Sequence, residues 1–142
     1  MSDSYKTEAE GHASCRAMKL KKLTTLLVVD AIEPLLPTWQ KLGYEIRVRV
    51  PDDGPLAFVI LKGAAGELML QTRAALLEDL PPVAERKPSH VLYGDVASLA
   101  DAEKALAHAR VIVPRRKTFY GANETWFELE GGLILGLAEH AE

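Results

Sequence analysis

A stretch near the C-terminus constrains the fold of this chain more than any other part of its sequence. Residues 125–129 include a β-branched residue and two aromatic ones, which favours a strand, and residues 133–138 are almost entirely apolar. Between them, Gly131-Gly132 tolerates positive φ, as a tight two-residue turn requires. The pattern therefore predicts an antiparallel hairpin. Alternation along its first strand places Glu124 and Trp126 on the same face.

The rest of the chain shows further strand and helix patterns. We expect strands over residues 22–30, 44–50, 56–62 and 67–72 with a helix over 31–42, and then strands over 88–94 and 110–117 with a helix over 97–108. Pro34 suits the first turn of the first helix, Pro37 delays its regular part, and Gly43 ends it. Residues 73–87 contain Pro81-Pro82, so we interpret them as a linker with one helical turn.

The same order of elements occurs twice along the sequence. Placing Asp30 over Asp95 aligns the two predicted helices and lays residues 68–70 over residues 133–135. Each half is a strand, a helix and three strands, so the sequence predicts an α+β fold of two βαβββ modules. We expect the modules at residues 22–72 and 88–139 of a single domain over 21–142, preceded by a flexible extension over 1–20.

Composition excludes several classes of protein. The net charge of −3, with both signs interspersed, argues against a nucleic-acid binder. No apolar run approaches the roughly 18 residues that a membrane span needs, and the N-terminus lacks the apolar region of a signal peptide. Cys15 is the only cysteine, so we expect a reducing, cytoplasmic location. We interpret Arg115-Arg116-Lys117 as a solvated strand end.

The closing hairpin resembles that of the vicinal oxygen chelate superfamily, which includes glyoxalase I, extradiol dioxygenases and the bleomycin-resistance proteins. The matching residues are Tyr120-Gly121, Glu124, Trp126 and Ala138-Glu139, whereas residues 129–132 replace the family's acidic turn. The resemblance covers nearly the whole chain beyond the N-terminal extension. It implies a cup-shaped, partly open mixed barrel with helices outside, one cleft for a small molecule, and a homodimer.

Metal-dependent members of that family hold a divalent ion with His and Glu side chains from the first and fourth strands of each module. His90 is the only retained ligand position, since the other three fall at residues 23–25, at Met69 or Gln71, and at Gly136. Catalytic metal sites take at least three protein ligands, so we expect no metal and no other cofactor. Glu67 and Glu124 are the candidates for a rearranged metal site.

Strand alternation predicts which side chains line the cup. The expected lining is Thr25, Leu27, Met69, Gln71, His90, Leu92, Glu124 and Trp126. From these and the matched hairpin, the predicted ligand-binding residues are Met69, Gln71, His90, Tyr120, Glu124 and Trp126. Trp126 offers a stacking surface, or alternatively packs in the core or in a dimer interface. His90 either donates to a ligand or is a hydrogen-bonded structural residue.

Three functions follow from this interpretation. The first is a metal-free small-molecule-binding protein similar to the bleomycin-resistance branch, with Glu124 and Glu128 favouring a cationic or hydroxyl-bearing ligand. The second is a metal-dependent lyase or dioxygenase of the glyoxalase type with a rearranged site. The third is a structural module whose cup is filled by its own side chains. The sequence favours the first and assigns no catalytic residue.

Overall fold

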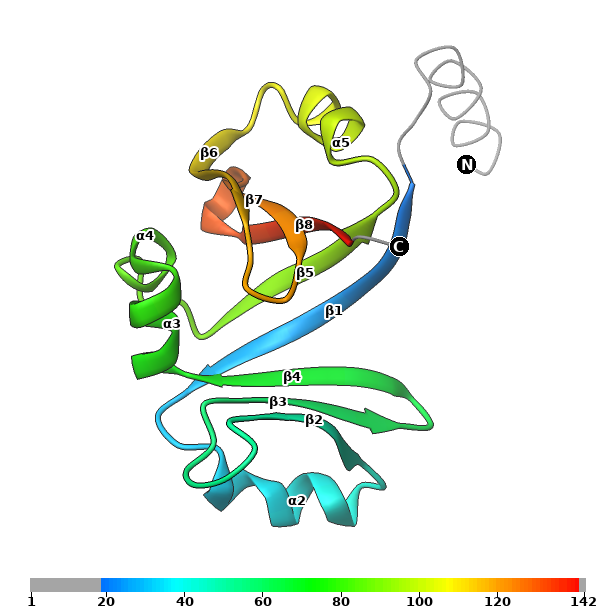
Figure 1. Cartoon of the computed structure of the whole chain (residues 1–142), viewed down its shortest axis with the longest axis vertical. Coiled ribbons are helices and arrows are strands. Elements are labelled where there is room, and N and C mark those ends of the chain that lie inside the picture. Colours follow the sequence, from blue (N-terminus) through cyan, green and yellow to red (C-terminus); the bar gives the residue numbers. More distant parts are fainter. Residues whose placement is uncertain (1–18, 141–142) are drawn as a thin grey trace.

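The computed structural model describes residues 19–140 and contains one open, eight-stranded mixed sheet (Figure 1). The strand order is β2-β3-β4-β1-β5-β8-β7-β6. The strands are β1 (Leu20–Val29), β2 (Glu45–Val50), β3 (Phe58–Gly63), β4 (Gly66–Thr72), β5 (His90–Val96), β6 (Arg110–Lys117), β7 (Ala122–Glu128) and β8 (Ile134–His140).

The two halves of the sheet have the same topology. In each half the first strand pairs in parallel with the fourth, as β1 does with β4 and β5 with β8. The remaining pairs within each half are antiparallel, and the antiparallel pair β1–β5 joins the halves. This arrangement confirms the predicted α+β fold built from two βαβββ units.

Helices cover both faces of the sheet. They are η1 (Glu33–Leu35), α2 (Leu36–Lys41), α3 (Arg73–Asp79), α4 (Pro81–Ala84), α5 (Leu99–Ala105) and the turn η2 (Glu130–Gly132). Helices α2 and α5 lie outside the two halves, whereas α3 and α4 lie between them at one end (Figure 1). We call the face that carries α2 and α5 the outer face of the sheet, and the opposite one the inner face.

Local sequence explains the helix boundaries. Pro34 and Pro37 fall in first turns, so a 3₁₀ turn precedes the short α2, as the second proline led us to expect. Gly43 follows α2 at φ 90°, a conformation that favours glycine at a helix end. Ser98 caps the N-terminus of α5, because its hydroxyl accepts a hydrogen bond from the Asp101 amide at 3.1 Å.

The predicted linker over residues 73–87 is instead a pair of helices, and this prediction is wrong beyond its single helical turn. Thr72 caps α3 by accepting a hydrogen bond from the Ala75 amide at 3.1 Å. Pro81 and Pro82 begin α4, where a missing amide hydrogen costs no helical bond. One apolar side of this pair is buried against the inner face, through Leu76, Val83 and Ala84 of the helices and Leu80 between them.

The closing hairpin exists, but its turn is longer than predicted. Glu128 pairs with Ile134, and the Leu129 amide donates to the Leu133 carbonyl at 2.8 Å. Gly131 and Gly132 have φ of 78° and 81°, so their conformational freedom is used as expected. The additional residues form a 3₁₀ turn in place of a two-residue turn.

The N-terminal extension predicted over residues 1–20 lies outside the described residues, except for its last two. Strand β1 already includes Leu20. Across residues 19–140, no helix is both long enough and apolar enough to cross a membrane.

Candidate functional site

Strand pairing divides the predicted cup lining between the two faces of the sheet. Leu26 pairs with Met69 and with Val91, and all three pack in the inner core. Leu27 pairs with His90, so His90 lies on the outer face. The expectation of one shared lining is therefore wrong for four side chains, which face outward: Thr25, Leu27, His90 and Leu92. Residues 26–29 are continuously apolar, so the sequence carries no period-two signal that would distinguish the faces.

His90 is exposed and away from the other predicted ligand-binding residues. Its Nδ1 lies 3.1 Å from the Ser89 hydroxyl, a local contact next to it in the chain. The other five residues all lie toward the inner side of the sheet: Met69, Gln71, Tyr120, Glu124 and Trp126.

The inner face of the second half is filled by the chain's own aromatic side chains. Trp126 is only 2% exposed and packs in the core. Its ring covers Gly136 so closely that a Cβ at that position would lie 2.7 Å from three ring atoms. The Tyr93 ring centroid is 5.9 Å from that of Trp126. Trp126 thus occupies the position of a core residue, which was the alternative to a stacking surface.

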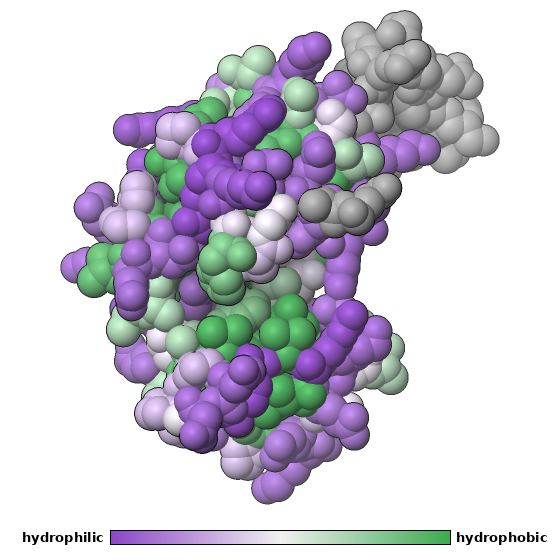
Figure 2. Space-filling view, viewed as in Figure 1, coloured by the Kyte–Doolittle hydropathy of each residue, from purple (hydrophilic) through white to green (hydrophobic). Residues whose placement is uncertain are grey.

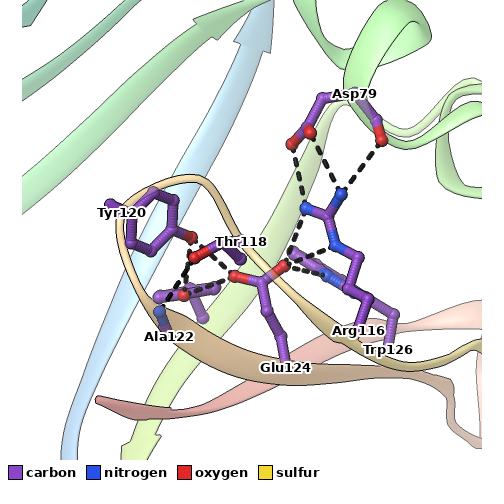
Figure 3. A network of polar contacts seen from close by, with 8 residues as sticks. Asp79, Arg116, Thr118, Tyr120, Ala122, Glu124 and Trp126 are labelled. Atoms are coloured by element: carbon purple, nitrogen blue, oxygen red, sulfur yellow. Dashed lines mark hydrogen bonds and ion pairs between the residues drawn. The ribbon is translucent and has the colours of Figure 1, made fainter. Parts of the chain in front are cut away.

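Glu124 lies at the centre of a buried polar network (Figure 3). It is 1% exposed, and its Oε2 accepts hydrogen bonds from the hydroxyls of Tyr93 and Tyr120, both at 2.6 Å. Its Oε1 accepts from Trp126 Nε1 at 2.9 Å and from Arg116 Nη2 at 2.9 Å. The carboxylate is therefore satisfied within the chain.

Arg116 connects this network to helix α3. Its Nη1 and Nη2 each donate to one Asp79 carboxylate oxygen at 3.0 Å, a bidentate pair (Figure 3). The interpretation of Arg116 as part of a solvated strand end is therefore wrong, since it bridges two carboxylates. Its partners are 37 and 8 residues away in the sequence, and no local pattern indicates them.

The network fixes the charges of its members. Burial alone would raise the pKa of Glu124, but hydrogen bonds from Tyr120, Tyr93, Trp126 and Arg116 lower it below the usual carboxyl value. Burial and the neighbouring carboxylate raise the pKa of both tyrosines above 10. Near neutral pH, Glu124 is an anion and the phenols are neutral donors.

The inner face of the first half is open by comparison. Val48 pairs with Ile60, Ile60 with Met69, and Phe58 with Gln71. We call these five residues the inner patch. Val48 is 39% exposed and the other four are half-buried. Apolar side chains gather in the recess between the two polar halves, over the first half of the sheet (Figure 2).

One end of the inner patch is charged. Glu67 accepts from Lys22 Nζ at 2.5 Å and from Arg47 Nη1 at 2.6 Å, and its side chain is 7% exposed. The hydrogen bond from Lys22 is the main cause of its lowered pKa. Lys62 is the cross-strand neighbour of Glu67. Beside this row lies a shallow, open depression lined by Gly43, Glu45, Ile46, Arg47, Lys62 and Gly63.

The residues present do not fit the divalent metal of the resembled family. His90 lies on the outer face, and Met69, Gln71 and Gly136 bring no ligand to the inner face. Glu67 is bound by two cations, and Glu124 is enclosed in the other half of the sheet. Within residues 19–140, no three His, Cys, Asp or Glu side chains form a group that could hold a metal ion.

Comparisons with known proteins identify the fold. The sequence matches no protein-family model and no curated protein. A glyoxalase/bleomycin resistance protein/dioxygenase superfamily member from Vibrio splendidus 12B01 superposes with a TM-score of 0.64, at 16% identity over 85% of this chain and 99% of that one. A protein from Staphylococcus aureus gives 0.61, at 16% identity over 87% of this chain and 100% of its own.

A third structure, methylmalonyl-CoA epimerase from Mycobacterium tuberculosis, gives a TM-score of 0.60 at 17% identity, over 91% of this chain and 96% of that one. The chain therefore has the fold of the vicinal oxygen chelate superfamily, as its closing hairpin indicated. Sequence identities this low show a shared fold and nothing finer.

Proposed function

We propose that this chain is a metal-free small-molecule-binding protein whose ligand lies on the inner patch. The observation that supports this most directly is the difference between the two inner faces. In the second half Trp126 and Glu124 are enclosed, whereas in the first half the inner patch is open. An apolar surface with one polar group, here Gln71, is the usual composition of a small-molecule site.

The metal-dependent alternative is less well supported by the same residues. An epimerase is among the structures with this fold, but that activity belongs to the Mycobacterium tuberculosis protein. In this chain, the two candidate carboxylates of a rearranged site, Glu67 and Glu124, already accept hydrogen bonds from other side chains and lie in different halves. Ligand binding by the inner patch needs neither of them.

We further propose that the protein is cytoplasmic and homodimeric, and that its dimer does not form by strand addition at the sheet edges. Both edges of the sheet are poorly suited to strand addition. Strand β2 contains a bulge between Ile46 and Val48, and β6 contains two irregularities and Pro114. Analytical ultracentrifugation tests the proposed dimer. A protein that sediments as a monomer would contradict it.

A neutral fluorescent probe tests the proposed function. N-phenyl-naphthylamine is apolar, and its fluorescence increases when it moves from water into an apolar environment. We expect saturable binding to protein treated with EDTA, unchanged when zinc, nickel or manganese is added back. Ile60→Trp fills the inner patch and should abolish binding, whereas Leu23→Trp, on the exposed outer face, should not. Equal binding to both variants, or binding only with metal, would reject the proposal.

A further inference from the structure

The carboxylates of the inner face differ from those of an acidic cleft. In the second half, Glu124 is paired with Arg116, and Glu128 with Arg86 at 3.3 Å and Arg110 at 3.8 Å. These two carboxylates were the reason to expect a cationic ligand. Because each has a cationic partner, neither offers an uncompensated negative charge.

The charged end of the inner patch has the opposite sign. This end carries three cationic side chains and two anionic ones. The cationic residues are Lys22, Arg47 and Lys62, and the anionic residues are Glu45 and Glu67. Glu67 is nearly enclosed, whereas the side chains of Lys22 and Arg47 are 43% and 53% exposed. The surplus charge that a ligand meets at this end is therefore positive.

We infer that the inner patch and this charged end together bind a small amphiphilic anion. The inference rests on the proposed function and names the class of its ligand. The apolar body lies on Val48, Ile60 and Met69, and a carboxylate, sulfonate or phosphate group lies against Arg47 and Lys62. A guanidinium has a planar fork of donors that suits such anions, and Glu67 occupies only part of it through Nη1.

The strand geometry sets the size of this ligand. Arg47 is adjacent to Val48 on β2, and Lys62 lies two residues beyond Ile60 on β3. Two residues along a strand span about 7 Å. We therefore expect a similar distance between the anionic group of the ligand and the centre of its apolar body.

A pair of matched probes tests the inference. Anilinonaphthalene sulfonate has the same aromatic body as N-phenyl-naphthylamine and adds one negative charge. The double variant Arg47→Gln/Lys62→Gln should weaken binding of the sulfonate about tenfold and leave the neutral probe within about twofold. Lys22 is retained so that Glu67 keeps a cationic partner. The control, Lys41→Gln/Lys104→Gln, removes the same charge from α2 and α5 and should change neither probe.

Glu45→Gln gives a test in the opposite direction. It removes the exposed carboxylate beside Lys62 and should strengthen sulfonate binding about twofold. If both probes bind equally well and neither variant separates them, the anion inference is wrong and the proposed function stands. If the neutral probe fails to bind the wild-type protein, the proposed function fails, and the inference fails with it.

Discussion

The two halves of this protein share a strand order and differ in what covers their inner faces. On β7 and β8, Trp126 pairs with Gly136, so a large side chain fills the space above a residue that has none. On β3 and β4, Ile60 pairs with Met69, and two medium side chains leave the surface partly exposed. The backbone pairing repeats, and the choice of side chains determines which half is open to a ligand.

The second half is closed by polar contacts as well as by packing. Four residues donate hydrogen bonds to Glu124, and one of them, Arg116, joins it to Asp79 at the end of α3. On the inner face of the first half, Glu67 forms ion pairs with Lys22 and Arg47, whose side chains are 43% and 53% exposed. Substitutions in the closed half should therefore affect the free energy of unfolding, and those in the open half should affect binding.

Removing the buried carboxylate should have the largest effect. Glu124→Ala removes the acceptor of the buried Tyr93 hydroxyl and Trp126 indole N–H and one carboxylate partner of Arg116, which should cost about 3–5 kcal/mol of unfolding free energy. Glu67→Ala, its counterpart in the open half, should cost about 1 kcal/mol or less, because its partners remain solvated. Urea unfolding followed by circular dichroism measures both. Equal losses of unfolding free energy in the two variants would contradict the claim that polar contacts stabilise the second half more than the first.

Adding a methyl group beneath Trp126 should have the next largest effect. Gly136→Ala places a Cβ in contact with the indole ring, and overpacking of this kind costs about 1–3 kcal/mol. In the background of Trp126→Phe, the same change should cost clearly less, since the smaller ring leaves room. A double-mutant cycle measures the difference, and additive costs would mean that the ring does not press on this strand.

Acid should weaken the closed half through Glu124. Its pKa is lowered in the folded protein, so its stabilising contribution is present above the ordinary carboxyl pKa of about 4.3 and is lost as the pH falls below it. We expect the unfolding free energy to decline as the pH drops through this range, and to decline less steeply in Glu124→Gln. Identical pH profiles for the two proteins would contradict the assignment of an ionised Glu124.

The smallest effect on stability is expected in the open half. Ile60→Trp should change the unfolding free energy by only about 0.5 kcal/mol, because the half-buried site has space on its solvent side. The same variant should no longer bind the neutral probe. A loss of stability comparable to that of Gly136→Ala would show that the inner patch is already closely packed.

Much of the fold could be predicted from the sequence, because the repeat and the two glycines of the closing hairpin are local signals. The sequence could not predict which side chains of β1 and β5 lie on the inner face and which on the outer face. Leu26 and Leu27 are equally apolar, and only the pairing register assigns them to opposite faces. The network could not be predicted either. Tyr93 and Glu124 are 31 residues apart, and Arg116 and Asp79 are 37 apart, so only the folded chain brings them together.

The helices α3 and α4 show a different limit of sequence analysis. Pro81-Pro82 suggested a break in structure, but a proline pair is compatible with the first turn of a helix. The buried positions of Leu76, Leu80 and Val83 were visible as an apolar spacing of four and three, which favours a helix. The apolar spacing agrees with the observed helices, whereas a proline pair by itself does not distinguish the start of a helix from a break.

Chemical-shift mapping of N-phenyl-naphthylamine tests the central claim most directly. During titration of the metal-free protein, we expect the backbone amides of Val48, Ile60 and Met69 to shift with a common saturation curve, while the indole N–H of Trp126, held by Glu124, stays in place. Shifts centred on Trp126 or on His90, with the inner patch unchanged, would contradict the claim that the open half binds the ligand.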